Sequence, residues 1–475
     1  MKTISSLLCG LAALFLMSSA SEVSAYSAGF DLLDHTSQLN FYHPANTFYP
    51  VEQTKLPEKC AVDQVHIVSR HMTRYPSTGS YNGIKRIETK VQEKLKQANA
   101  SVIAPELEFL RTWKLDSMIP NPTAQVENIT ALGLQEAFDF GSQVRTKYAH
   151  LFQQDATVWS GSVERVQLTA KSFMKGLYGQ AAEDNHYANL ITSNSSDKSI
   201  AGNTLTPIDT IAANTLTPID TCTNFPKGLS GPHQDAFQAT YVPKTLERLE
   251  KLWPNFGFIT DDFFGLMDLC MYEMNFVGKD QRHFCAIFTD EEWVNHGYNR
   301  DLGYFYDSGW GNPLARTAGY PYAAAVSKLL AQPKTESCQK IYAAFSHDTQ
   351  LNVFMTALGI FEDASLSDAT VDANRRFRSS RALAMGSRIV TERINCGSDG
   401  SFVRLMVNDA VVPFEDCKSG PGLSCSLEDY LVRLKGIQAK VGDFMTKCGV
   451  AASGSLSSEL RLFDNPARNL CSSPY

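Results

Sequence analysis

Two groups of arginine, histidine and aspartate side chains follow two stretches whose patterns predict buried β-strands. The stretches are residues 61–70 and 340–346, and the side chains that end or follow them are Arg70, His71, Arg74, His347 and Asp348. Open α/β sheets bind ligands in the crevice beyond the carboxyl ends of their strands, so we expect the two groups to lie together. Arg165, at the start of the helix predicted after a further strand, is expected to join them.

These residue types suit the chemistry of phosphate esters. An arginine guanidinium stays charged and presents a planar fork to phosphate oxygens, and each charge-assisted hydrogen bond contributes about 1.5–3 kcal/mol. An imidazole nitrogen is a competent nucleophile toward phosphorus once a hydrogen bond to the other nitrogen orients the ring. A carboxylic acid beside the leaving oxygen can supply its proton, and Asp348 is the candidate for that role.

Each of these side chains also has a simpler interpretation. Arg70 and Arg74 could be surface arginines, His71 a hydrogen-bonded core histidine, and Asp348 the N-cap of the helix that follows. Their joint position favours a common site, because a random scatter of ten histidines would rarely place two at strand ends beside arginine and aspartate. The other eight histidines have no comparable surroundings and are expected to be structural; they stand at positions 35, 43, 66, 150, 186, 233, 283 and 296.

The pattern of hydrophobic residues predicts an α/β fold that would position these side chains. The predicted strands are 61–70, 157–162 and 340–346, and helical patterns follow the second and the third. Two β-rich segments, 386–396 and 402–414, are joined by a turn that contains two glycines. The region from about 181 to 315 has polar loops and helical stretches, so we expect a mainly helical insertion over the sheet.

The composition is that of an ordinary globular protein, and it limits the partners. Hydrophobic residues make up 43%, charged residues make up 20%, and the formal net charge is -7. A general binder of nucleic acid or of anionic membranes would need a basic surface, so we expect neither partner. The GxxxxGKS/T, HExxH and GxSxG motifs are absent, which argues against P-loop, zinc-protease and serine-hydrolase chemistry.

The first 25 residues predict entry into the secretory pathway. Lys2, the apolar run 7–17 and the small residues at 23–25 are typical of a signal peptide. No later stretch of about 18 apolar residues occurs, so we expect no membrane span. Removal of Cys9 with the signal leaves ten of the 11 cysteines, which suits disulfides in an oxidising compartment. Glycosylation sequons begin at Asn99, Asn128 and Asn194. We therefore expect a secreted glycoprotein, released or retained in the periplasmic space or cell wall.

At the strand-end residues the sequence resembles a known family. RHMTRYPS at 70–77 resembles the RHGxRxP signature of the histidine acid phosphatase superfamily, and SHDT at 346–349 resembles its HD pair. The likeness extends over nearly the whole mature chain. The stretch 407–425 resembles secreted fungal and yeast acid phosphatases, a group that includes phytases.

This resemblance implies a fold with two parts. One part is an α/β domain of the phosphoglycerate-mutase-like type, with a mixed, mostly parallel sheet flanked by helices, built from 26–180 and 316–475. The other is an inserted, mainly α-helical cap domain at 181–315. Similar yeast proteins are often oligomeric, so a homo-oligomer stays open.

The resemblance also implies a reaction on small-molecule phosphate monoesters that needs no metal or other cofactor. His71 would attack phosphorus and form a phosphohistidine, and Asp348 would protonate the departing alcohol before water cleaves the intermediate. The phosphoryl oxygens would be held by Arg70, Arg74, Arg165 and His347. Glu273, in a stretch similar to the family's cap segment, could influence a preference for phytate, although a solvated carboxylate on a helix face is the simpler interpretation.

Disulfide pairings follow from the same resemblance. They are Cys60 with Cys396, Cys222 with Cys448, Cys270 with Cys285, and Cys417 with Cys425. The last two cysteines, Cys338 and Cys471, are left to pair with each other.

One residue departs from the family's signature, because Met72 stands where the family has glycine. Glycine is needed where φ is positive or where backbone approaches a ligand closely, so a methionine could displace His71. If φ is negative, Met72 could instead point away or line the pocket rim. We expect an active phosphatase, because the other site residues persist. A secreted phosphate-binding or wall-associated glycoprotein disabled by Met72 is the rival hypothesis, and an intracellular mutase of related architecture is a third.

Overall fold

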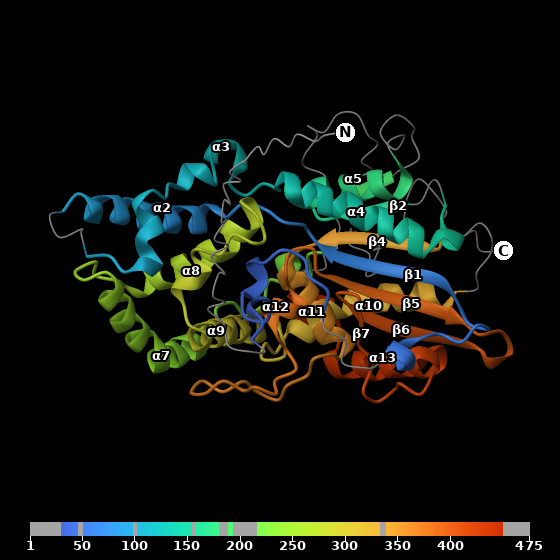
Figure 1. Ribbon diagram of the computed structural model, residues 1–475. Coiled ribbons are helices and arrows are strands. Elements are labelled where there is room, and N and C mark those ends of the chain that lie inside the picture. Colours follow the sequence, from blue (N-terminus) through green and yellow to red (C-terminus); the bar gives the residue numbers. More distant parts are fainter. Residues whose placement is uncertain are drawn as a thin grey trace, which may run out of the picture.

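An eight-stranded mixed sheet forms the centre of the α/β part (Figure 1). The structure is a computed structural model, and it describes residues 30–45, 51–97, 102–153, 157–179, 189–192, 216–332 and 339–449. The strands are β1 Ala61–Arg70, β2 Thr157–Ser160, β3 Asn189–Thr192, β4 Ile341–Ser346, β5 Arg388–Asn395, β6 Ser401–Val407, β7 Ala410–Val411 and β8 Cys425–Ser426.

The strand order is β3-β2-β4-β1-β5-β6-β7, with β8 beside β6. The first four strands in this order are parallel, whereas β5, β6 and β7 extend the sheet in antiparallel fashion. The predicted α/β class with a mixed sheet is thereby confirmed. The two β-rich segments near the end of the chain are β5 and β6, which pair as a hairpin.

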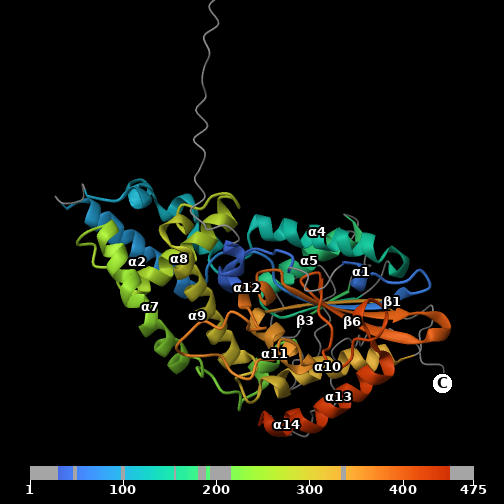
Figure 2. The same cartoon turned by 60° about the horizontal axis from the view of Figure 1, so that its bottom comes forward.

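Helices cover both faces of the sheet, which explains why β4, with the sequence IYAAFS, is almost entirely apolar and buried along its whole length. α4 and α5 lie on one face, and α10, α11 and α13 lie on the other (Figures 1 and 2). The bounds of these helices are α4 Ala131–Lys147, α5 Glu164–Tyr178, α10 Ala315–Ala331, α11 Asp348–Leu358 and α13 Leu427–Val441. α4 and α5 touch through glycines, since a Cβ on Gly141 would lie 2.0 Å from the carbonyl oxygen of Phe173. The short helices are α1 Val51–Thr54, α3 Pro122–Gln125, α6 Pro218–Thr221, α12 Ser379–Ala382 and α14 Phe444–Lys447.

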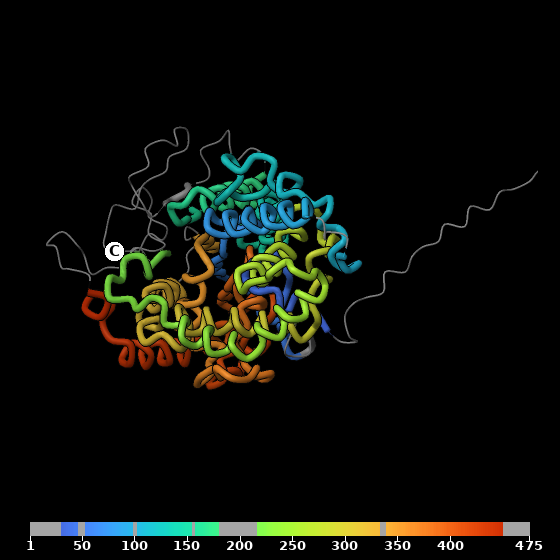
Figure 3. The backbone as a smooth tube through the Cα atoms, turned by 90° about the vertical axis from the view of Figure 1, so that its left-hand side faces the viewer, coloured from blue at the N-terminus to red at the C-terminus, as the bar shows by residue number. Residues whose placement is uncertain are grey.

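A second group of helices stands beyond one end of the sheet (Figure 1). Its members are α2 Thr78–Leu95, α7 Gly231–Leu252, α8 Thr260–Phe276 and α9 Asp290–Ser308. Figure 3 views the molecule from this end and shows α2, in blue, beside the green and yellow helices. Lys90 of α2 forms an ion pair with Asp262 of α8 at 2.5 Å. We call these four helices the helical body. It includes α2, which lies outside residues 181–315, and the proposed domain boundaries stay a prediction.

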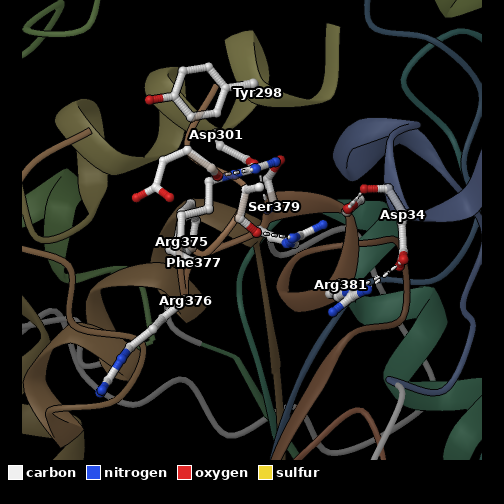
Figure 4. Close-up of polar contacts among 12 residues, drawn as sticks. Asp34, Tyr298, Asp301, Arg375, Arg376, Phe377, Ser379 and Arg381 are labelled. Atoms are coloured by element: carbon white, nitrogen blue, oxygen red, sulfur yellow. Dashed lines mark hydrogen bonds and ion pairs between the residues drawn. The ribbon is translucent and has the colours of Figure 1, made fainter. Parts of the chain in front are cut away.

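Polar pairs fasten the segment before β5 (Figure 4). The backbone that follows pairs with the end of β1, because the N–H of Gly386 donates to the carbonyl oxygen of His71 at 3.0 Å. The guanidinium of Arg375 contacts Asp301 of α9 at 2.6 Å, and the same carboxylate accepts hydrogen bonds from the backbone and the hydroxyl of Ser379. Arg381 reaches the carboxylate of Asp34 near the start of the described chain. These contacts fix the backbone that follows, which borders the candidate site.

Four disulfides occur in the described residues, and they are the first four pairings that the resemblance implied. They join Cys60 to Cys396, Cys222 to Cys448, Cys270 to Cys285 and Cys417 to Cys425. The fifth predicted pair, Cys338 with Cys471, lies outside the described residues, as does the predicted signal peptide 1–25. Among the helices that the structure describes, none is long and apolar enough to cross a membrane.

Candidate active site

The pairing of β1 with β4 brings the two predicted groups of side chains together. The strands are parallel, and their register places Arg70 opposite Ser346 at the carboxyl ends. The backbone N–H of His71 continues this pairing by donating to the carbonyl oxygen of Ser346 at 3.0 Å. β2 lies on the other side of β4, and α5, which follows β2, carries Arg165 in its first turn. Three strand ends therefore supply the site.

The imidazole of His71 is buried and held through one nitrogen. Nδ1 lies 2.9 Å from the carbonyl oxygen of Met72. Nδ1 must carry the proton to donate to this carbonyl, which leaves the lone pair on Nε2. Burial, reinforced by the charges of Arg70 and Arg74, lowers the pKa of His71 well below its usual value. The ring is therefore neutral, and so nucleophilic, in mildly acidic solution.

His347 meets His71 edge to face. The two ring centroids are 5.7 Å apart, and the ring planes form an angle of 71°. Burial, together with the charge of Arg165, lowers the pKa of His347 to about 4. A neutral ring still has one N–H that can donate to a phosphoryl oxygen. His347 also occupies the N-cap position of α11, so the simpler interpretation of Asp348 as the N-cap is wrong.

Arg70 is buried and its guanidinium has three hydrogen-bonding partners, so it is not a surface arginine. Only 1% of its surface is exposed. Nη1 donates to the carbonyl oxygens of Gln38 and Leu383, the latter at 2.7 Å, and Nη2 lies 2.8 Å from Oδ2 of Asp348. These contacts hold the guanidinium plane beside the imidazole of His71.

The other two predicted arginines are held by single neighbours. Nη1 of Arg74 donates to the carbonyl oxygen of Tyr75 at 2.7 Å, and Nη1 of Arg165 lies 3.4 Å from both a backbone and a carboxylate oxygen of Glu127. Burial, with the charge of Arg74, lowers the pKa of Arg165 to about 10, so its guanidinium stays charged. The Nε atoms of Arg70, Arg74 and Arg165 are all buried without a hydrogen-bond partner among the described residues. Buried donors in this condition are expected to serve a ligand.

Asp348 follows His347 at the start of α11, and both of its carboxylate oxygens accept hydrogen bonds. Oδ2 accepts from Arg70 and from the hydroxyl of Tyr304, each at 2.8 Å. Oδ1 accepts from the backbone N–H of Thr349 at 2.9 Å. Burial by itself would raise the pKa of Asp348, but Arg70, Tyr304 and His347 outweigh it, so the pKa lies below its usual value.

Met72 points away from the site. Its φ is not among the positive values found for non-glycine residues in the described chain. Its side chain is buried in the core, and Gly386 leaves room for it, because a Cβ on Gly386 would lie 2.6 Å from Sδ of Met72. The backbone N–H of Met72 donates to Oγ1 of Thr169 at 3.2 Å. Of the alternatives set out above, the structure supports the one in which φ is not positive and the side chain points away into the core.

We therefore expect that restoring the family's glycine damages the protein. Met72→Gly removes a buried side chain and adds backbone freedom, so the free energy of unfolding falls by about 3 kcal/mol. Activity toward an aryl phosphate does not increase, since no positive φ is relieved. Urea unfolding and steady-state assays measure both quantities, with the exposed Val102→Gly as a control for glycine outside a helix or strand. A large gain of activity from a near-zero wild-type level would instead support the disabled-glycoprotein hypothesis.

Glu273 is not the solvated carboxylate that the simpler interpretation predicted. It is buried in α8, where its oxygens accept from Nδ1 of His283 at 2.7 Å and from the backbone N–H of Phe284 at 3.1 Å. These contacts lie within the helical body, where the carboxylate of Glu273 joins α8 to the segment at His283 and Phe284. A role of Glu273 in substrate choice stays a prediction.

Several residues that support the site carry no motif in the sequence. The carboxylate of Glu136 in α4 accepts from the backbone and the hydroxyl of Thr73, at 3.2 and 2.7 Å. Thr169 of α5 links the N–H of Met72 to the carbonyl oxygen of Arg165. Tyr304 reaches the site from α9, more than 40 residues before Asp348 in the chain. Only their contacts in the folded chain identify them.

Only one of the three predicted glycosylation sites lies within the described residues. Asn128 is half-buried, and its Nδ2 donates to the carbonyl oxygen of Ala124 at 2.8 Å. Asn99 and Asn194 lie outside the described residues. Glycosylation at all three positions stays a prediction.

The assembled side chains belong to one class of site. A neutral imidazole with a free lone pair lies within the electrostatic reach of three guanidinium groups, and a carboxylate is paired with one of them, all beyond the carboxyl ends of parallel strands. Guanidinium donors bind oxyanions rather than cations. Within the described ranges, no three His, Cys, Asp or Glu side chains gather as metal ligands. The fold and the site therefore define an α/β protein that binds a phosphate-like oxyanion next to a histidine.

The chain belongs to the histidine phosphatase superfamily (branch 2), whose profile matches residues 61–408. It is 32% identical over 449 residues to the acid phosphatase PHO1 of Komagataella pastoris, covering 91% of this chain and 90% of that protein. It is 31% identical over 422 residues to the phytase PHO112 of Candida albicans, covering 86% and 85%. Among solved structures, it is similar to the phytase from D. castellii, with a TM-score of 0.79, 27% identity and 94% of each chain covered.

Proposed function

We propose that this protein is an acid phosphatase that releases orthophosphate from phosphate monoesters through a phosphohistidine at His71. The observation that carries the proposal is the buried imidazole, held through Nδ1 and surrounded by three arginines with unused Nε–H donors. The relatives named acid phosphatase agree with this function.

The first step transfers the phosphoryl group to the protein. Nε2 of His71 forms a bond to phosphorus while the bond from phosphorus to the leaving oxygen breaks. In the fraction of the protein in which Asp348 is protonated, its carboxyl group gives the proton to that oxygen, so an alcohol departs and a carboxylate remains. Negative charge on the transferred oxygens is stabilised by donors from Arg70, Arg74, Arg165 and His347.

The second step restores the free enzyme. The carboxylate of Asp348 takes a proton from water, whose oxygen attacks phosphorus as the bond to Nε2 of His71 breaks. Orthophosphate leaves, and the imidazole is again neutral. Asp348 thus serves as acid in one step and as base in the next.

Replacing Arg165 with glutamine tests the electrostatics of this site. Arg165 is one of the positive charges that lower the pKa of His71, so its loss raises that pKa. At low pH, kcat/KM falls because His71 becomes protonated and loses its nucleophilic lone pair. In the variant this fall therefore occurs at higher pH. The lost donor also lowers kcat/KM at the optimum by about 10- to 150-fold, which corresponds to about 1.5–3 kcal/mol. A pH series on the variant measures both effects. Arg111→Gln, which removes a surface pair with Glu108, is the control, and a fall that stays at the wild-type pH in Arg165→Gln argues against the assignment.

A panel of esters tests the proposed function as a whole. Purified wild-type protein is assayed for phosphate release from p-nitrophenyl phosphate, glycerol 2-phosphate and phytate at mildly acidic pH. We expect release from all of the simple esters. Release from phytate alone would favour a phytase. Release from none of the esters would support the rival hypothesis of a phosphate-binding glycoprotein without activity.

We also propose that the protein acts outside the cytosol. Its four described disulfides suit an oxidising compartment, and the predicted signal peptide agrees with them.

A further inference from the structure

We propose that Tyr304 is a positioning residue for the general acid, because its hydroxyl occupies Oδ2 of Asp348 and so confines the transferable proton to Oδ1. This inference rests on the proposed function and adds to it a residue from the helical body beyond the sheet. It concerns how the proton is placed, not how phosphate is bound.

The geometry joins Tyr304 to Asp348 through two helices. Tyr304 lies near the end of α9, and its hydroxyl donates to Oδ2 of Asp348, the first residue of α11, at 2.8 Å. The two helices are also fastened one turn further along α11. There the side-chain amide of Asn352 donates to the carbonyl oxygen of Tyr304 and to the hydroxyl of Ser308, each at 2.9 Å. The hydroxyl of Tyr304 is therefore set at a fixed distance from the carboxylate.

Tyr304 is the donor in this contact while Asp348 is ionised. Burial, with the negative charge of Asp348 second, raises the pKa of Tyr304 well above its usual value. The phenol thus keeps its proton over the whole range in which an acid phosphatase works. An ionised carboxylate has no proton to give, so the hydrogen of this bond comes from tyrosine.

Counting lone pairs shows what this donor does. A carboxylate oxygen accepts about two hydrogen bonds. Oδ2 of Asp348 already accepts from Arg70 and from Tyr304, whereas Oδ1 accepts only from the N–H of Thr349. The proton that Asp348 gains in each turnover therefore enters at Oδ1. Without the hydroxyl of Tyr304, the proton can also bind to Oδ2. The carboxyl group then no longer holds its proton in a single orientation toward the leaving oxygen.

The test compares two esters whose leaving groups differ in their need for a proton. Glycerol 2-phosphate expels a strongly basic alkoxide, whereas 2,4-dinitrophenyl phosphate expels a weakly basic phenolate. In Tyr304→Phe we expect kcat/KM for glycerol 2-phosphate to fall by about 10- to 30-fold and that for the dinitrophenyl ester by less than about threefold, since only the first needs general-acid help. The ratio kcat/KM is the right quantity because it reports the step that forms phosphohistidine.

A matched control lies two residues further along the same helix. Tyr306 is also half-buried, but its hydroxyl donates to the carbonyl oxygen of Leu366, away from the carboxylate. Tyr306→Phe should leave both esters within about twofold of wild type. Competitive inhibition by inorganic phosphate, expected within about threefold of wild type in Tyr304→Phe, shows that the site is folded. Tyr304→Leu supplies a second variant without the hydroxyl if the first is poorly folded.

A double-mutant cycle with Asp348→Asn separates positioning from a general structural effect. If Tyr304 acts through Asp348, adding Tyr304→Phe to Asp348→Asn causes no further leaving-group-dependent loss. Equal losses for both esters, or no loss for glycerol 2-phosphate, would overturn the inference while leaving the phosphatase function intact. A wild-type protein that hydrolyses neither ester would instead refute the proposed function, and the inference with it.

Discussion

Replacing His71 with alanine lowers kcat/KM for p-nitrophenyl phosphate by at least about 10,000-fold, or about 5.5 kcal/mol of transition-state stabilisation. The reason is that the variant has no atom left to bond to phosphorus. His347 is the nearest other imidazole, but its ring centroid lies 5.7 Å from that of His71, and it enters from a different strand. Steady-state assays with a sensitive phosphate readout measure the loss.

The control for this prediction is a histidine outside the site. His150 is exposed and contacts the carbonyl oxygen of Val62 through Nε2 at 2.7 Å. His150→Ala should keep at least about half of the wild-type activity, as surface substitutions usually do. Turnover by His71→Ala above about one hundredth of the wild-type rate would remove His71 as the nucleophile.

Replacing Arg70 with lysine, which keeps the charge, lowers kcat/KM by about 1,000-fold. The guanidinium joins two backbone carbonyls and the carboxylate of Asp348 at once, with Nε still available to the ligand. A lysine ammonium is a single point on a flexible stem and cannot make this set of contacts. Loss of one or two charge-assisted hydrogen bonds, at about 1.5–3 kcal/mol each, accounts for the magnitude.

The same substitution also weakens the fold. The half-buried carbonyl of Gln38 and the buried carbonyl of Leu383 lose their donor, so we expect the free energy of unfolding to fall by about 2 kcal/mol. Kinetics and urea unfolding are measured on the same preparation. Arg86→Lys is the control, because Arg86 is exposed and lies 3.6 Å from an equally exposed Asp261. Activity of Arg70→Lys within tenfold of wild type would show that charge alone suffices.

The strand-end residues could be predicted from the sequence because they depend on local pattern. A parallel strand that is buried on both faces is an unbroken apolar run, and the first polar residues after it must lie at the sheet edge. His71, Asp348 and Arg165 each follow a predicted strand, so the sequence alone predicts that they lie near one another. The pairing of β1 with β4, and of β4 with β2, is what brings them together.

The residues that the sequence did not reveal depend on packing between distant segments. Glu273 lies on a helix that is buried on nearly every side, so its polarity alone wrongly suggested solvent exposure. The fit of Met72 requires the open space at Gly386, more than 300 residues later. Tyr304 belongs to α9, whose position over α11 follows from tertiary contacts such as those of Asn352. No spacing or motif encodes these relations.

Trapping the phosphorylated protein examines the proposed mechanism at its chemical centre. Wild-type protein is mixed with labelled substrate for milliseconds, quenched in alkali, in which phosphohistidine is preserved, and digested for peptide mapping. The mechanism requires label on the peptide that contains His71, attached to imidazole nitrogen, and none in His71→Ala. Label on any other residue, or rapid hydrolysis with no labelled protein at any time, would show that His71 is not the nucleophile.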